Sequence, residues 1–262
     1  MGKIRKKWLV LGGTAALLAV GSVILWCWPR EPEPTKHEQV ASAIEKTEAR
    51  DSFTIQIYST GTISAGDVRQ SVQTSGYLHT EGETDYTSIY VNTSSRTENA
   101  TSADFDVTVA MYCDGKDVYD NTGSVPVQMD MTCQEFQQIV GEYGLYHYDV
   151  ADITDITYAE TEKEGFNGGQ YSVTLSKPRD EILSAYAGIL SDATGETVAK
   201  ENLTVLSAYV LYSIYDGEVV SQTCSFTVCC TMADGKDAYY SAVNQVAYLQ
   251  SPDQAGMGEE TT

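Results

Sequence analysis

Residues 203–249 read LTVLSAYVLYSIYDGEVVSQTCSFTVCCTMADGKDAYYSAVNQVAYL, and this stretch decides the fold. It holds three long runs, 203–215, 218–232 and 236–249, in which β-branched and aromatic residues alternate with small polar ones. Such alternation is typical of strands that bury one face. The runs are separated by Asp216-Gly217 and Asp234-Gly235, a dipeptide favoured in tight hairpins because it tolerates positive φ. The stretch therefore predicts an antiparallel meander.

The same pattern extends toward the N-terminus. Phe53, Ile55 and Ile57 alternate with polar residues, and Asp114-Gly115 supplies another hairpin signal. Further strands are predicted at 68–79, 85–93, 104–113, 116–121, 125–131, 150–158 and 169–175. The chain therefore carries about ten strands in antiparallel order.

Three helices interrupt the strands. A capping box at Thr35 opens a helix over residues 36–50, and a second box at Thr132 opens a short helix that ends near Gly144. A third helix starts at Pro178 and ends at Gly195. The predicted class is α+β: an N-terminal transmembrane helix, then a large curved antiparallel sheet (half-barrel) of about ten strands covered by about three helices.

The N-terminal stretch WLVLGGTAALLAVGSVILWCW, residues 8–28, has no ionisable acid or base and follows a basic flank. As a helix it would reach about 31 Å, the thickness of a hydrocarbon core, and the flank favours a cytoplasmic N-terminus. The predicted organisation is a cytoplasmic tail (1–7), a transmembrane anchor (8–28), a proline-rich spacer (29–35), an exported α+β domain (36–250) and a flexible tail (251–262). We expect a single-pass cell-membrane protein with its C-terminal domain outside. A signal peptide cleaved near Ala19 is the alternative.

Charge limits the partners. All 37 acidic residues but only 11 of the 16 basic ones follow residue 30, which gives the exported part a formal charge of −26. Such a surface repels nucleic acid and anionic headgroups. We therefore expect no nucleic-acid partner, and a ligand that is neutral, cationic or apolar.

Five cysteines lie beyond the anchor, an odd number for an oxidising exterior. Cys224 and Cys230 fall on apolar strand faces, and so does Cys113. The pattern slightly favours buried, unpaired thiols over a disulfide between Cys113 and Cys133, and both alternatives stay open.

No motif dictates a reaction. The three histidines are scattered and no nucleophile elbow is present, so we expect no catalytic residues and no enzyme. His147, Asp149, Asp152 and Asp155 supply oxygen and nitrogen ligands near one another, but without the spacing of a calcium loop. We expect neither a metal site nor a cofactor.

Certain segments carry a family resemblance. The helix 38–46 leads straight into Phe53-Thr54-Ile55-Gln56-Ile57, Asp-Gly-Lys hairpins follow, and the chain ends its last strand with 245–248 (QVAY). In this layout the chain resembles the LolA/LppX-type lipoprotein-carrier domains and related uncharacterised exported domains of Gram-positive bacteria. The resemblance implies a space for lipid or acyl chains between sheet and helices. An uncleaved anchor instead of a lipidated cysteine departs from that pattern.

The leading hypothesis is therefore a membrane-anchored domain that binds a lipid, another apolar ligand or a lipidated partner between sheet and helices. The alternative is a non-enzymatic cell-surface interaction or structural module with a solid core. Candidate ligand-binding residues share the apolar strand faces: Ile55, Ile57, Ile89, Val91, Phe105, Val107, Val109, Phe226 and Val228.

Overall fold

The computed structural model describes residues 33–98, 104–141, 143–161 and 166–249. The chain divides into two units, Met1–Thr35 and Lys36–Thr262, and the fold is that of the second. Its strands are β1 (Ser52–Ala65), β2 (Val68–Glu81), β3 (Tyr86–Glu98), β4 (Phe105–Asp114), β5 (Val118–Asp120), β6 (Val127–Gln128), β7 (Ile153–Glu160), β8 (Gly168–Leu175), β9 (Thr204–Tyr215), β10 (Glu218–Thr231) and β11 (Asp237–Leu249).

All strands join one antiparallel sheet of 11 strands in the order β6-β5-β4-β3-β2-β1-β11-β10-β9-β8-β7. Strands that are consecutive in the chain are also neighbours in the sheet, except β6 and β7, which lie at opposite edges. The first and last strands, β1 and β11, are neighbours at the centre of the sheet, where Ile57 pairs with Val246. The sheet is therefore two meanders joined at β1 and β11. It stays open, with β6 and β7 at its edges.

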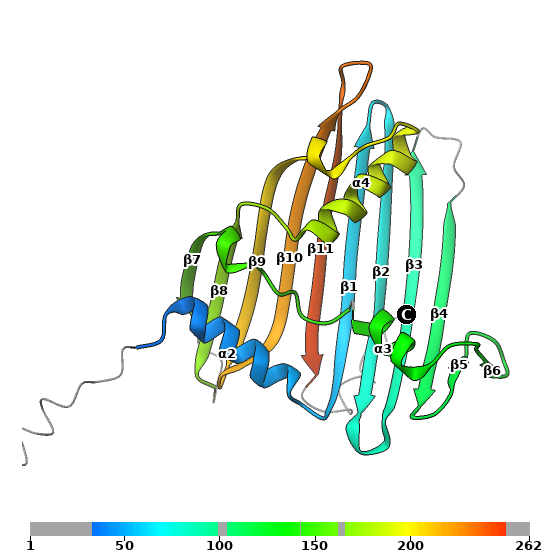
Figure 1. The fold of residues 1–262 in the computed structure, drawn as a ribbon, viewed down its shortest axis with the longest axis vertical. Helices are drawn as coiled ribbons and strands as arrows, with labels where there is room; N and C mark the ends of the chain where they lie inside the picture. Colours follow the sequence, from blue (N-terminus) through cyan, green and yellow to red (C-terminus); the bar gives the residue numbers. More distant parts are fainter. Residues whose placement is uncertain (1–32, 99–103, 142, 162–165, 250–262) are drawn as a thin grey trace, which may run out of the picture. The chain divides into compact units, whose positions relative to one another are not determined.

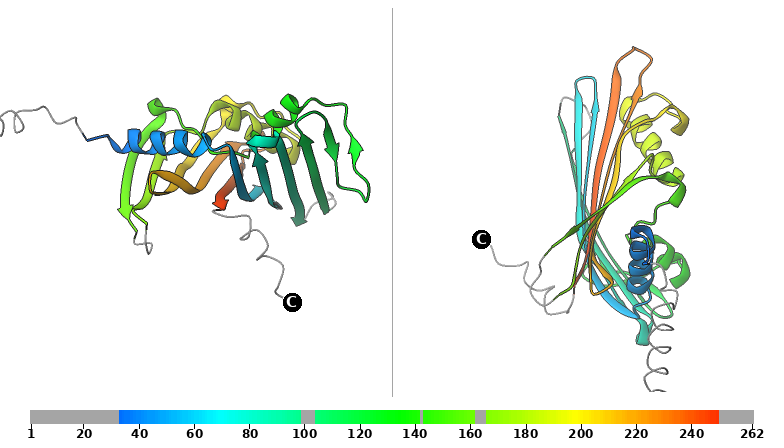
Figure 2. Two further views of the ribbon diagram at one scale, coloured as in Figure 1. Left: turned by 90° about the horizontal axis from the view of Figure 1, so that it is seen from below. Right: turned by 90° about the vertical axis from the view of Figure 1, so that its left-hand side faces the viewer.

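Three α-helices are described: α2 (Lys36–Glu48), α3 (Cys133–Gly141) and α4 (Asp180–Thr194). All lie on the same face of the sheet, which bends around them (Figures 1 and 2). We call this the covered face, and the opposite one, over which the described residues place no helix, the bare face. Amphipathic periodicity explains the packing, because α2 buries Val40 and Ile44 and α4 buries Leu183 and Leu190.

Side chains alternate between the two faces. Residues paired across the antiparallel ladder point to the same side, so Ile55, Leu78 and Ile89 form one row on the covered face. Farther along the sheet Phe226 lies beside Ala242 on that face. These residues are 0–5% exposed and belong to the hydrophobic core of the described part of the chain.

Local chemistry sets the element ends. Gly195 ends α4 at φ 72°, and Asp216 and Gly217 adopt φ 52° and 75° in a tight turn. The predicted turn at Asp114-Gly115 is shifted by one residue. The Asp114 backbone pairs with Asp117 while the Asp114 carboxylate accepts the Lys116 and Asp117 N–H groups, so Gly115 and Lys116 form the centre.

The antiparallel α+β architecture and its three covering helices confirm the sequence prediction at that level, with 11 strands where about ten were expected. The predicted anchor, 8–28, lies outside the described residues. Within the part of the chain that the structure describes, no helix combines the length and the apolar composition needed to cross a membrane.

A disulfide joins Cys113 at the end of β4 to Cys133 at the start of α3. The preference for unpaired thiols is therefore wrong for these two residues. The error arose because Cys133, on a helix, was placed on no strand face, although it packs against the core. Cys224, Cys229 and Cys230 are free thiols.

Candidate functional site

A cavity of about 630 Å³ lies on the covered face, between the sheet and the chain that crosses it. Its floor comes from β1, β10 and β11, and its walls from α4 and the segment that follows α3. It is lined by Ile57, Tyr58, Ser59, Thr74, Gly141, Tyr143, Gly144, Leu145, Tyr146, Arg179, Glu181, Ile182, Ala185, Tyr186, Gln222, Cys224, Phe226, Asn244, Gln245 and Val246.

The floor is mainly apolar. Phe226 is fully buried, and the ring of Tyr146 tilts against it with centroids 5.3 Å apart. Burial raises the pKa of the Cys224 thiol to about 12, so this sulfur is neutral at physiological pH. Ser59 donates a hydrogen bond to Asn244 and gives the floor a polar margin. The cavity therefore combines an apolar base with polar groups at one side.

Buried hydrogen bonds fix the wall segment around Tyr146. The Tyr146 N–H donates to Gln222 Oε1 at 2.8 Å, and Gln222 Nε2 donates to the Tyr146 carbonyl at 3.1 Å. Tyr212 Oη donates to the same carbonyl at 2.7 Å. Gln222 is 2% exposed, and a buried amide needs hydrogen-bond partners. The backbone N–H and carbonyl of Tyr146 supply both partners, and these bonds hold the wall segment to β10.

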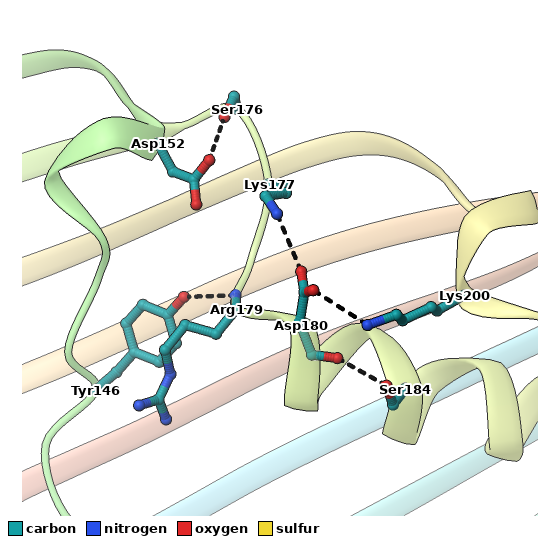
Figure 3. Close-up of polar contacts among 8 residues, drawn as sticks. All are labelled: Tyr146, Asp152, Ser176, Lys177, Arg179, Asp180, Ser184 and Lys200. Carbon is teal, nitrogen blue, oxygen red and sulfur yellow. Dashed lines mark hydrogen bonds and ion pairs between the residues drawn. The ribbon is translucent and has the colours of Figure 1, made fainter.

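Arg179 lies at the rim, where α4 begins (Figure 3). Its backbone N–H donates to Tyr146 Oη at 3.1 Å, and its guanidinium carbon lies 5.2 Å from the centre of that ring. Burial raises the pKa of the Tyr146 hydroxyl, which therefore stays protonated. The rim thus presents an exposed cation stacked on a neutral aromatic ring.

The first turn of α4 is held from two sides. Asp180 accepts hydrogen bonds from Lys177 at 3.0 Å and from Lys200 at 3.1 Å (Figure 3). The Lys177 hydrogen bond, together with the charges of both lysines, lowers the pKa of the Asp180 carboxyl. The Ser176 hydroxyl also donates a hydrogen bond to the carboxylate of Asp152, the last residue of the η2 turn (Val150–Asp152). These exposed contacts position the helix end that carries Arg179.

The predicted ligand-binding residues occupy different environments. Ile57 and Phe226 line the cavity. Ile55, Ile89, Val91 and Val228 are buried in the core away from it, and Val109 packs against that core. Phe105 and Val107 are 45% and 48% exposed. They lie beyond the part of β4 that pairs with β5, so only β3 flanks them and, among the described residues, their other side has no strand beside it.

Several lining residues have weak sequence signals. In the sequence, Ile182 and Tyr186 recur at helical spacing in the segment that starts at Pro178, and Tyr143 lies on the apolar stripe of the segment that starts at Thr132. This spacing does not separate a cavity wall from an ordinary core. Tyr146, Arg179 and Gln222 were missed. Nothing in the alternation marks Gln222 as different from an ordinary polar strand residue.

The residues considered as calcium ligands do not converge. His147 pairs with Glu48 at 2.7 Å, and Asp149 accepts the Ala151 N–H in the η2 turn. Among the residues that the structure describes, no three His, Cys, Asp or Glu side chains are grouped to hold a metal ion.

Comparison with known proteins gives no family. No family model matches the chain, and no curated protein matches it. The predicted resemblance to the LolA/LppX carriers therefore has no support at the family level.

Among solved structures, a lipovitellin structure concerned with lipid–protein interactions aligns at a TM-score of 0.35 and 9% identity, over 76% of this chain and 25% of that one. A DUF1329 family protein from Desulfovibrio piger aligns at a TM-score of 0.20 and 9% identity, over 84% and 92%. Each alignment runs over a large antiparallel sheet of this chain, but similarity at this level carries no functional argument.

Proposed function

We propose that this protein binds an apolar or amphiphilic ligand, a lipid or the acyl chain of a lipidated partner, in the cavity between the sheet and α4. The observation that carries the proposal is the cavity itself. Its volume of about 630 Å³ lies within the range of small-molecule sites. Its base of Ile57, Phe226 and Val246 matches a hydrocarbon chain.

The energetics favour such a ligand. Each methylene that leaves water for an apolar wall contributes about 0.8 kcal/mol. The wall is already ordered, because Gln222 and Tyr212 hold the Tyr146 backbone unit, so little conformational entropy is lost on binding. The ligand's polar end would lie at the rim, beside the Arg179 guanidinium and the exposed Glu181. This pair of opposite charges suits a neutral or zwitterionic group.

The proposal includes the location predicted from sequence. Residues 8–28 would anchor the chain in the cell membrane, and the domain that follows would lie outside the cell. A tether of this kind keeps the cavity near the bilayer, which is both a source of apolar ligands and a site for lipidated proteins. We propose no reaction.

A pair of substitutions on neighbouring residues of α4 tests the proposal. Ala185 lines the cavity, whereas the exposed Ser184 does not. The full-length chain in lipid nanodiscs would be exposed to a photoreactive fatty alcohol, and covalent labelling would be quantified by mass spectrometry. Ala185→Phe should reduce labelling several-fold because the new ring fills the cavity, and Ser184→Phe should leave it unchanged. Absence of specific labelling, or equal labelling of both variants, would contradict the proposal.

A further inference from the structure

The bare face of the sheet has an unusual composition for such an acidic chain. Register places Thr174, Tyr209, Ser225, Val243, Thr60, Gln73 and Ser94 in one row across β8, β9, β10, β11, β1, β2 and β3. The next row is Ser172, Leu211, Thr223, Gln245, Tyr58, Ser75, Asn92 and Thr108, and it reaches β4. From β8 to β3 neither row contains an acidic or basic side chain, although the protein has 37 acidic residues. The first row continues at its two ends to Asp155 on β7 and Asp106 on β4, so the uncharged surface is bounded by these carboxylates.

These side chains point away from the helices. They alternate with the buried residues of the same strands, and α2, α3 and α4 all lie on the other side (Figure 2). The charged residues of this face lie toward the strand ends, as Arg69, Glu98 and Asp114 do. The centre of the face is thus a broad surface of hydroxyls, amides and tyrosine rings.

The aromatic rings on this face are exposed. Tyr58 and Tyr209 are 39% and 41% exposed. Tyr77 is 47% exposed and stacks on Tyr90 across the strands, with centroids 5.5 Å apart. A hollow of about 500 Å³ lies where the pairing of β8 and β9 ends, lined by Ser172, Thr174, Ser207 and Tyr209 together with Leu175, Ser176, Val205, Leu206 and Ala208. Rings in such a setting offer an apolar surface with a hydrogen-bonding tip.

This composition selects among partners. A nucleic acid or an anionic membrane requires cations, which the two rows do not contain. A sheet from a second protein would pack best against an apolar face. In the two rows, however, only Val243 and Leu211 have aliphatic side chains. A partner rich in hydroxyls and free of charge would exchange hydrogen bonds with Ser, Thr, Asn and Gln without removing any ion from water.

We propose that the bare face binds a neutral polysaccharide lying across the strands. Sugar C–H groups pack against Tyr58 and Tyr209, and sugar hydroxyls exchange hydrogen bonds with the surrounding Ser, Thr, Asn and Gln side chains. The two sites lie on opposite faces of the sheet, and among their residues only Tyr58 and Gln245 belong to both the cavity lining and the bare-face rows.

Pull-down experiments test the proposal. The full-length chain in nanodiscs would be incubated with insoluble cellulose and chitin and, in affinity electrophoresis, with soluble mannan and mixed-linkage β-glucan; empty nanodiscs give the background. We expect retention on at least one of these neutral glycans. The double variant Tyr58→Ala/Tyr209→Ala should weaken it roughly tenfold, the effect of losing two aromatic contacts.

Tyr158→Ala provides the matched control. Tyr158 is 42% exposed but lies beside Tyr171, on the covered side of β7 and β8, so its loss should leave retention unchanged. Ser225→Glu, which places a charge in the centre of the bare face, should abolish retention while the unfolding midpoint stays near that of the wild type. Three results would overturn the proposal: no retention on any of the four glycans, retention that survives the double variant, or a concentration-dependent dimer that Ser225→Glu dissociates, which would assign the face to a second copy.

Discussion

The two faces of one sheet differ in what lies against them, although the same strands supply both. On the covered face Phe226, Val228 and Cys230 are buried beneath helices, while on the bare face Thr227 and Cys229 alternate with them in partial contact with solvent. The covered face gains stability by burying apolar area, and the cavity lined by Ile57 and Phe226 lies on this side. The bare face carries polar side chains whose loss costs the fold little. Adjacent residues of one strand therefore have different roles: one side chain stabilises the core, and the next is available for contacts at the surface.

The largest expected effect comes from substituting adjacent residues of β10. Phe226→Ala should reduce the free energy of unfolding by about 3–5 kcal/mol, because it leaves a void in a fully buried site. Thr227→Ala removes a hydrogen bond to Ser241 on the bare face and should cost about 1 kcal/mol or less. Urea denaturation of both variants measures the difference. Equal losses of unfolding free energy in the two variants would contradict the difference between the covered and bare faces.

The disulfide should have the next largest effect. It closes a loop with a sequence separation of 20 between β4 and α3. Replacing both Cys113 and Cys133 with Ala should lower stability by about 3 kcal/mol, the value expected for a loop of this length. A reducing agent should reproduce the shift in the wild type, and it should leave the unfolding of the double variant unmoved.

Gln222 sharpens the comparison because it is a polar residue on the covered face. Gln222→Leu should cost about 1–3 kcal/mol, since the buried Tyr146 N–H loses its partner. The same change should weaken ligand labelling, because the wall of the cavity is no longer fixed. Gln73→Leu, on the bare face of β2 and outside the cavity lining, is the control and should change neither quantity. Undiminished labelling in the Gln222 variant would show that this wall does not shape the site.

The smallest effect concerns pH. The Arg50 hydrogen bond, helped by the charges of Arg50 and Lys46, lowers the pKa of Glu218 below its ordinary value of 4.5 and ties α2 to β10. A lowered folded-state pKa stabilises the fold above pH 4.5, and this contribution declines as pH falls through the folded-state value. It should amount to about 1 kcal/mol or less. Stability curves of wild type and Glu218→Gln should converge below that range, and parallel curves would contradict the assignment.

Much of the fold follows from local sequence patterns. Alternation at Phe53, Ile55 and Ile57 sets the strand and its buried side, and the box at Thr132 and Glu135 forms as expected, with the Glu135 N–H donating to Thr132 Oγ1 at 3.2 Å. Turn chemistry then pairs consecutive strands. These features depend on residues close together in the chain, so the sequence predicts them directly.

The cavity depends on contacts that no such pattern encodes. Gln222 and Tyr212 hold Tyr146 across sequence separations of 76 and 66 residues, and these bonds set where the wall segment runs. For Phe105 and Val107, by contrast, the local pattern predicts burial that the long-range contacts do not provide. Alternation predicts them on the covered side, but β5 pairs only with 111–113 of β4, which leaves them exposed.

Peptide mapping of the photolabel tests the central claim most directly. The full-length chain in nanodiscs would be labelled with a diazirine-bearing fatty alcohol, digested and sequenced by mass spectrometry. We predict modified residues in the wall segment around Tyr146, in α4 near Ala185 and on the covered face of β10 near Phe226. Labels confined to the bare-face Tyr77 and Tyr209, or to the exposed Phe105 and Val107, would contradict the account.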